Sequence, residues 1–239
     1  MDLRYTNLQK ADLRDCNLSG SNLEGANLSG ADLLGANFSH ASLSMANFSE
    51  AYLSRVELVN YDLRYTNFSR ANLEWANPTG ADLSGANLSE AKLSGATLAK
   101  SNLTRSNLSG VVLTGADLNK AILIDAQLIK ADLSRGFFRE ADLLEANLMK
   151  STLKAAILTN ANLAGADISK ALLNDAILDN ANLHGAILNH ADLTNASLDN
   201  ADLTMTELNH VIGLIQKQLT GACYYEEFGA PKDRGSKLE

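Results

Sequence analysis

Residues 26–35 read Ala26-Asn27-Leu28-Ser29-Gly30-Ala31-Asp32-Leu33-Leu34-Gly35, two copies of a five-residue unit that continues on both sides without a break and governs the fold. Read in fives from Met1, the third residue of each block up to Leu208 is Leu, Phe or Ile, with Pro78 as the only exception among 42 blocks. One repeat running through residues 1–210 of a 239-residue chain argues for one elongated domain.

The period of five predicts the geometry of the chain. It fits neither the 3.6-residue period of a helix nor the two-residue period of a strand, so the chain must turn once per block. The third residue and the first, which is Ala in 29 of the 42 blocks, are expected to point inward. The fifth is Gly in 11 blocks and Asn, Asp or His in 11 more, the residues that best tolerate positive φ in a turn. The sequence therefore predicts an all-β solenoid of short straight sides, stacked about 4.7 to 4.9 Å apart.

The pattern Ala-(Asp/Asn)-Leu-x-x, as in Ala81-Asp82-Leu83-Ser84-Gly85 and Ala86-Asn87-Leu88-Ser89-Glu90, resembles the pentapeptide-repeat proteins, a family abundant in cyanobacteria. The resemblance implies a right-handed, quadrilateral β-helix with four blocks per coil and about ten coils. The residues alone leave three blocks per coil open, because outward apolar residues recur at a spacing of 15 as well as 20.

Two departures from the repeat predict local irregularities. Tyr61 occupies a first position that is Ala in most blocks, and a phenol does not fit the narrow interior unless the backbone bulges. Pro78 removes an amide from the ladder at an inward position. We interpret both as tolerated defects in a stable stack, with a partner-binding bump as the less favoured alternative.

After His210 the period breaks, and Val211, Ile215, Leu219 and Ala222 take a helical spacing. The pattern predicts a β-helix over 1–210, followed by a short capping helix and tail over 211–239, with the helix covering the last open coil. The repeat begins at Met1 without a cap, so we expect either a lost upstream segment or another chain at that end.

Composition limits the classes of partner. The net charge is −8, and no Lys or Arg lies between Lys170 and Lys217. A charge balance of this kind speaks against direct binding of nucleic acid, which needs clustered basic residues. No apolar run is long enough to span a membrane and no targeting segment opens the sequence, so a cytoplasmic protein is expected. The acidic residues of the last coils form a candidate acidic patch: Asp175, Asp179, Asp192, Asp199, Asp202 and Glu207.

Most outward positions are polar, since 26 of the 42 second positions are Asp or Asn. With a spacing of 20 residues, large apolar residues would stack in three places, which form a candidate interaction surface: Phe137, Ile157 and Ile177 on the fourth face, Ile124 over Leu144 on the first, and Ile129 over Met149 on the second. Ladder packing and an interface patch are equally good explanations of this pattern.

No catalytic, cofactor-binding or metal-binding constellation is found in the sequence. His190 and His210 would stack on one face, but a structural metal site needs four ligands and turn residues are the better interpretation. The leading hypothesis is a non-enzymatic protein interaction scaffold of unknown partner, with a homodimer through an end or through the apolar stripe as one possibility. The alternative, implied by the resemblance, is a DNA-mimicking modulator of a type II topoisomerase such as gyrase.

Overall fold

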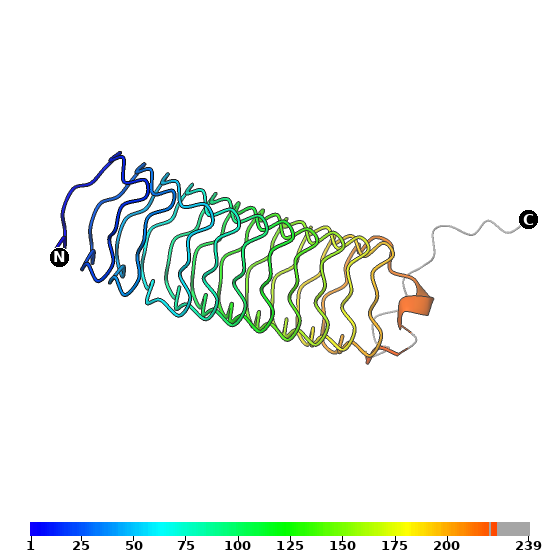
Figure 1. Cartoon of the computed structure of the whole chain (residues 1–239). Coiled ribbons are helices and arrows are strands. Elements are labelled where there is room, and N and C mark those ends of the chain that lie inside the picture. The colour runs from blue at the N-terminus through cyan, green and yellow to red at the C-terminus, as the bar shows by residue number, and fades with distance from the viewer. Residues whose placement is uncertain (220, 224–239) are drawn as a thin grey trace, which may run out of the picture.

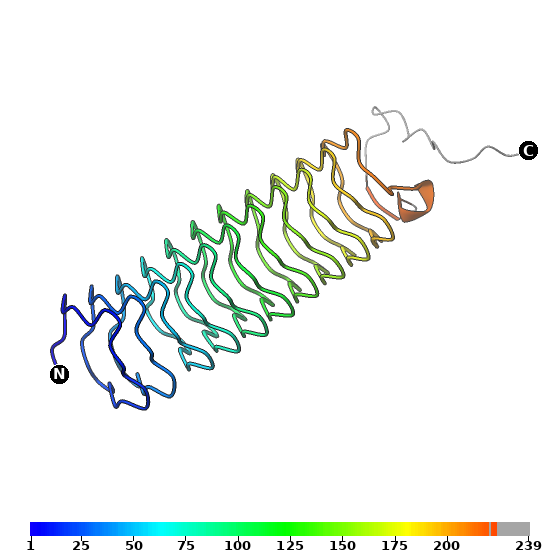
Figure 2. The same cartoon turned by 90° about the horizontal axis from the view of Figure 1, so that it is seen from above.

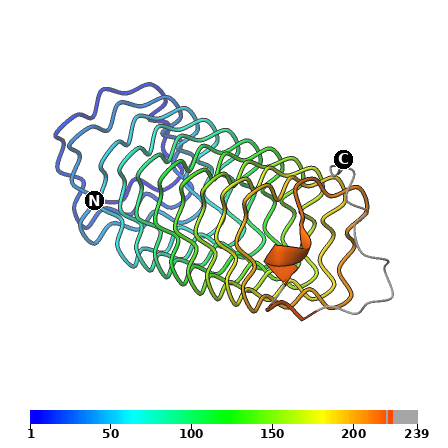
Figure 3. The same ribbon diagram turned by 90° about the vertical axis from the view of Figure 1, so that its right-hand side faces the viewer.

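The computed structural model describes residues 1–219 and 221–223, which form one rod of stacked coils (Figure 1). The two ends of the rod are far apart, and successive coils follow one another along it without crossing (Figures 1 and 2). Viewed from its C-terminal side, the rod is a stack of open loops, one behind the next (Figure 3). The chain is therefore a solenoid, as the repeat predicts.

Parallel bridges join second positions that lie 20 residues apart, from Asp2 with Asn22 to Asp192 with Ile212. Each coil thus contains four blocks and has four sides, and the alternative of three blocks is wrong. We call the sides the first, second, third and fourth faces, after the second positions Asp2, Asn7, Asp12 and Asn17 and the residues that follow each of them at steps of 20. Each bridge is isolated, because the chain turns before a longer strand can form.

The core follows the predicted inward positions. Third-position leucines and first-position alanines are buried along most of the rod, with Leu128 and Ala126 both 0% exposed, and those of the first coil, such as Leu3 and Leu8, are partly buried. Phenylalanines occupy some of the third positions, and the rings of Phe48 and Phe68 stack with centroids 5.1 Å apart. Burial of this continuous apolar column is the main stabilising contribution to the rod.

Each block ends in a tight turn that is closed by an N–H of the next block, for example Ala11 N to Leu8 O at 3.1 Å. Every fifth position from Tyr5 to His210 has positive φ, glycine or not. The feature is that of type II turns, in which the third of the four turn residues adopts positive φ. Twenty of these positions hold neither Gly, Asn, Asp nor His, so the stacking of the coils overrides the local preference.

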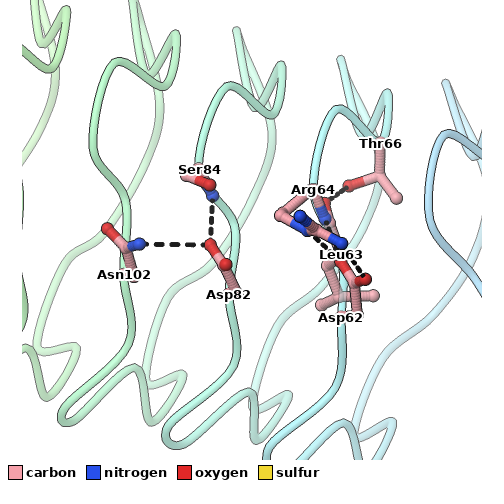
Figure 4. A network of polar contacts seen from close by, with 7 residues as sticks. All are labelled: Asp62, Leu63, Arg64, Thr66, Asp82, Ser84 and Asn102. Carbon is pink, nitrogen blue, oxygen red and sulfur yellow. Dashed lines mark hydrogen bonds and ion pairs between the residues drawn. The ribbon is translucent and has the colours of Figure 1, made fainter.

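The second position has a structural role that its outward direction alone does not reveal. The side-chain oxygen of Asp or Asn there accepts a hydrogen bond from the backbone N–H two residues on, as Asp82 does from Ser84 at 3.0 Å (Figure 4). Such Asx turns hold the chain in the conformation that starts the turn. The same Asp82 oxygen accepts from Asn102 of the next coil at 3.2 Å, which links neighbouring coils.

Where a block has Asp at its second position and Arg at its fourth, the Arg guanidinium donates hydrogen bonds to the Asp carboxylate. In Figure 4 the guanidinium of Arg64 donates to both oxygens of Asp62, at 2.8 and 2.7 Å. Hydrogen bonding to this guanidinium holds the pKa of the Asp62 carboxyl below its ordinary value. Behind them, the hydroxyl of Thr66 donates to the carbonyl of Leu63 at 2.6 Å, which satisfies a polar group inside the rod.

Tyr61 interrupts the ladder, as predicted. Within residues 1–219, the bridges that would join Asn37 to Glu57 and Ser42 to Asp62 are missing, although those in the adjoining coils are present. The Tyr61 hydroxyl donates to the carbonyl of Phe38 at 2.6 Å. That carbonyl also accepts the N–H of Ala41 at 2.7 Å, so the phenol hydroxyl is satisfied inside the gap as a second donor to a turn carbonyl.

Pro78 produces a smaller irregularity on the fourth face. Among the described residues, the bridge between Asn77 and Thr97 is missing, because Pro78 has no N–H to donate to the Thr97 carbonyl. The hydroxyl of Thr79 donates to the side-chain oxygen of Asn77 at 2.6 Å and also lies 3.3 Å from that carbonyl. Pro78 also fills less of the interior than Leu does, and a cavity of about 10 Å³ lies beside it between third-position side chains.

Replacement of Pro78 by Leu is expected to stabilise the rod by about 1 kcal/mol. The change restores one ladder amide and buries additional methylene groups, which together outweigh the lost restriction of the unfolded chain. Thermal unfolding of Pro78→Leu measures the gain. A melting temperature of Pro78→Leu at or below that of wild type would contradict this account.

The predicted capping helix is wrong. The only helix in the described residues is the short 3-10 helix η1, Gln216–Leu219. The ladder continues past His210, because Ile212 pairs with Asp192 and Cys223 with Asp202. The last coil is covered by buried Leu214 and Leu219, whereas Ile212 is 56% exposed. The predicted tail beyond Cys223 lies outside the described residues.

Gln218 closes the end of the rod by hydrogen bonding. Its amide nitrogen donates to the carbonyls of Leu193 and Ala196, at 2.9 and 2.8 Å, and its amide oxygen accepts from the N–H of Ile215 at 2.7 Å. The Ala196 carbonyl is thus satisfied, and the Leu193 carbonyl, which also accepts the N–H of Ala196 at 2.9 Å, gains a second donor. Within the described part of the chain, no helix is long and apolar enough to cross a membrane.

Candidate interaction surface

The structure brings Phe137, Ile157 and Ile177 together in one ladder on the fourth face. Parallel bridges join Phe137 to Ile157 and Ile157 to Ile177, which confirms the predicted stacking. Phe137 is 38% and Ile177 37% exposed, and Ile157 between them is half-buried. Asp117 and Ser197 continue the ladder on either side, so the apolar stripe, defined as Phe137, Ile157 and Ile177, is bounded by polar residues.

Charged side chains lie beside the apolar stripe. The guanidinium carbon of Arg139 is 6.0 Å from the centroid of the Phe137 ring, close enough for a weak cation–π contact. Two coils further on, the Asp179 carboxylate accepts hydrogen bonds from the hydroxyl of Ser197 and, at 3.3 Å, from the N–H of Asp199. The apolar stripe therefore has a guanidinium beside Phe137 at one end and a carboxylate beside Ile177 at the other.

The other predicted apolar residues lie apart from this stripe. Ile124 and Leu144 are half-buried on the first face, and Ile129 and Met149 are half-buried on the second. Each pair lies in neighbouring coils, since the carbonyls of Leu144 and Met149 accept the N–H groups that follow Ile124 and Ile129, both at 3.0 Å. Neither pair is continuous with the stripe, and their burial fits packing between coils.

The six residues of the predicted acidic patch do not gather in one place. Asp202 lies on the first face, Glu207 on the second and Asp192 on the third, while Asp179 and Asp199 lie on the fourth and Asp175 at its edge. The structure thus spreads these carboxylates around all four sides of the rod. On the corner between the second and third faces, three lysines, Lys130, Lys150 and Lys170, follow one another at steps of 20 residues.

Local hydrogen bonds account for the ionisation of two of these carboxylates. The Thr204 hydroxyl donates to Asp202 at 2.6 Å, and this bond is the main cause that lowers the pKa of Asp202. Partial burial would raise the pKa of Asp192, but hydrogen bonds from Thr194 and Asn174 outweigh it and hold the pKa below its ordinary value. Both groups are charged at neutral pH, and neither has the raised pKa of a general acid.

The imidazole rings of His190 and His210 stack with centroids 4.9 Å apart, as the 20-residue spacing predicts. In the described part of the chain, no group of three or more His, Cys, Asp or Glu side chains could hold a metal ion. The stacked pair contributes to corner packing.

Ion pairs across coils were missed by sequence reasoning. Arg70 pairs with Glu90 at 3.0 Å and Lys120 with Glu140 at 3.2 Å, each basic residue lying over an acidic one 20 residues later at a corner. A search for opposite charges at that spacing would have found them. Such exposed pairs contribute little stability, but they show how charges are arranged along a corner.

Comparison with known proteins supports the identity of the repeat. The profile described as "Pentapeptide repeats (8 copies)" matches residues 2–33, 98–135, 106–143, 138–175 and 176–212, and that described as "Pentapeptide repeat region" matches 31–108. Together they cover the chain from residue 2 to residue 212. A search of curated protein sequences found no match.

Several solved structures are similar to the chain. HetL, a pentapeptide repeat protein involved in heterocyst differentiation regulation from the cyanobacterium Nostoc sp. strain PCC 7120, is 32% identical over 91% of this chain and 89% of its own, with a TM-score of 0.46. A trypsin-treated form of QnrB1, a plasmid-mediated fluoroquinolone resistance protein, is 16% identical over 92% of this chain and 88% of its own, with a TM-score of 0.52.

At 16% identity the likeness to QnrB1 is one of fold alone, a right-handed quadrilateral β-helix. The family profiles, the 20-residue coil and the inward Leu and Ala columns agree with one another. The chain belongs to the pentapeptide-repeat family.

Proposed function

We propose that the chain is a non-enzymatic scaffold for protein interactions and that the apolar stripe is its contact surface. The observation that carries the proposal is the run of three exposed or half-buried apolar residues on one ladder, between Asp117 and Ser197. Packing within the ladder does not require them, because the polar residues of neighbouring coils pair in the same way.

The energetics fit a contact surface. Full burial of a side chain such as Phe or Ile contributes about 1.5 to 3 kcal/mol, and loss of translational and rotational freedom on association offsets part of that gain. The rod presents the stripe on a rigid backbone ladder, so little conformational entropy is lost when a partner binds. A stripe of this size supports a specific but moderate affinity.

The alternative of DNA mimicry directed at a type II topoisomerase has less support. It calls for acidic groups in continuous rows, whereas the acidic side chains of the last coils are divided among the four faces and a lysine row lies on one corner. Similarity to QnrB1 at 16% identity carries the fold and not the target.

Replacement of all three stripe residues by Asn is expected to leave folding intact and to abolish recovery of the partner from an extract of the source cell. Asn occurs at many second positions of the ladder, so melting temperature should change by only a few degrees. Affinity capture followed by mass spectrometry, with wild type and variant side by side, makes the measurement.

The matched control replaces Ile122, Leu172 and Ile187 by Asn. These three residues occupy second positions on the first, third and second faces, so the control makes the same chemical change off the fourth face. If the control loses the same partners, or if the stripe variant keeps them, the stripe is not the contact surface.

A further inference from the structure

Four charged side chains are placed symmetrically around the apolar stripe. Arg135 and Asp175 lie at the same corner of the rod, one coil before and one coil after the coil of Ile157. Arg139 and Asp179 are related in the same way on the other side of the stripe. Each basic residue is therefore matched by an acidic one across Ile157.

Within the described residues none of these four side chains makes an ion pair, in contrast to Arg70 with Glu90 at 3.0 Å. Their in-chain counterparts are two coils away, about 9.6 Å at the usual strand spacing, which is too far for contact. Arg135, Arg139 and Asp175 are exposed and Asp179 is half-buried. All four are available to a partner.

This arrangement is self-complementary under one operation. The operation is a rotation about a two-fold axis that passes through Ile157, lies in the plane of contact and is perpendicular to the rod. It places a second rod face to face with the first and running in the opposite direction. Each column, meaning a row of residues spaced 20 apart, then lies opposite the same column of the partner. The rotation sets Phe137 opposite the partner's Ile177, Arg135 opposite the partner's Asp175, and Arg139 opposite the partner's Asp179. We propose that two copies of the chain associate in this way, as an antiparallel dimer through their fourth faces.

The remaining residues of the face agree with the same operation. Over the five coils from Asp117 to Ser197, no two like charges are set opposite each other; the further oppositions are Asp117 with Ser197, Asn119 with Asp199, Lys120 with Asn200, and Glu140 with Asn180. Like charges across an interface are strongly unfavourable. Their absence over these five coils fits an isologous contact, in which the same surface of both copies must be self-complementary.

A parallel dimer through the same face fits less well. Its two-fold axis would run along the rod and would set the corner of Arg135 opposite the corner of Glu140, which already pairs with Lys120 at 3.2 Å. Arg139 and Asp179 would then have no opposite charge to meet. The antiparallel arrangement alone pairs all four of the charges around the stripe.

The contact is small and is expected to give a weak dimer. Five overlapping strands extend about 24 Å along the rod, so the buried area falls at the low end of the size range for specific interfaces. We expect a dissociation constant of about 100 μM, weakened by added salt because the four ion pairs lie at the rim. The stripe then supplies the apolar centre and the charges fix the direction.

This inference rests on the proposed function, since it names a second copy of the chain as a partner of the same stripe. Sedimentation equilibrium at chain concentrations up to 1 mM tests it with two double variants of equal net charge. Arg135→Asp with Asp175→Arg exchanges charges within one column and should dimerise as wild type does. Arg139→Asp with Asp175→Arg sets like charges opposite each other in both columns and should weaken dimerisation about tenfold or more.

The two variants share Asp175→Arg, leave Asp179 and its hydrogen bonds in place, and differ only at the exposed residues Arg135 and Arg139, so circular dichroism of both verifies that they fold alike. Wild type that stays monomeric at 1 mM, or variants that dimerise equally well, would overturn the antiparallel dimer. Neither result bears on capture of another protein by the stripe, which the Asn variants measure separately.

Discussion

Leu128→Asp should prevent the rod from folding at room temperature. Leu128 is 0% exposed in the middle of the core column. Its backbone N–H donates to the carbonyl of Asn147 at 2.7 Å, so the backbone cannot rotate to turn the side chain toward solvent without breaking this ladder bond. An unpaired carboxylate buried there costs several kcal/mol, and the lost Leu adds about 2 to 5 kcal/mol. The sum is comparable with the whole stability of a typical domain.

Circular dichroism and thermal unfolding of Leu128→Asp measure this effect, with Gln127→Asp as the control. Gln127 is the adjacent residue but points outward and is exposed, so the control adds the same charge without burying it. A melting temperature for Leu128→Asp within a few degrees of wild type would show that the third position does not face the core.

The repeat was sufficient to predict which residues are buried, because every third position has the same inward environment. It did not decide between three and four blocks per coil, although a signal was present. Asparagine recurs without interruption at steps of 20, at Asn7, Asn27, Asn47, Asn67, Asn87 and Asn107. In the structure these side chains form a ladder, with Asn27 donating to Asn7 at 3.3 Å and Asn87 to Asn67 at 3.2 Å.

The C-terminal end could not be predicted in the same way. Val211, Ile215, Leu219 and Ala222 have a helical spacing, but the ladder of the preceding coil continues to Ile212 and prevents a helix from starting there. Gly213 then has φ 72, and a Cβ at this residue would lie 2.5 Å from the Cα of Thr194. Pairing with the coil below, which is a tertiary contact, decides the conformation of this segment over its local pattern.

The candidate surface was predicted only in part. The stacking of Phe137, Ile157 and Ile177 follows from the period, whereas the acidic residues were treated as one patch because they are close in sequence. In a four-sided coil, a separation of five residues moves a side chain to the next face. Proximity in sequence is therefore a poor guide to proximity on this surface, and a spacing of 20 is a good one.

A large residue at a first position should open the ladder wherever it is placed. Tyr61 shows the effect, since the bridges from Asn37 to Glu57 and from Ser42 to Asp62 are missing around it within residues 1–219. Ala161 lies five coils further on in the same column and is 1% exposed. Ala161→Tyr is expected to break the equivalent bridges, which join Phe137 to Ile157 and Asp142 to Asn162.

The physical reason is that the interior at Ala161 has room for a methyl group only. Overpacking costs about 1 to 3 kcal/mol, and each ladder bond that opens without a replacement adds about 1 kcal/mol. We therefore expect Ala161→Tyr to lower the free energy of unfolding by about 3 to 5 kcal/mol. Hydrogen exchange should report loss of protection at the amides of Ile157 and Asn162, which donate to Gly136 and Ala141, both at 2.9 Å.

Ala164→Tyr is the control for this variant, because Ala164 lies three residues later at an outward fourth position and is half-buried. The same ring there can extend along the surface and should leave both amides protected. Protection at Ile157 and Asn162 that survives in Ala161→Tyr would mean that the interior accommodates a phenol without separating the coils, and that the gap at Tyr61 has another cause.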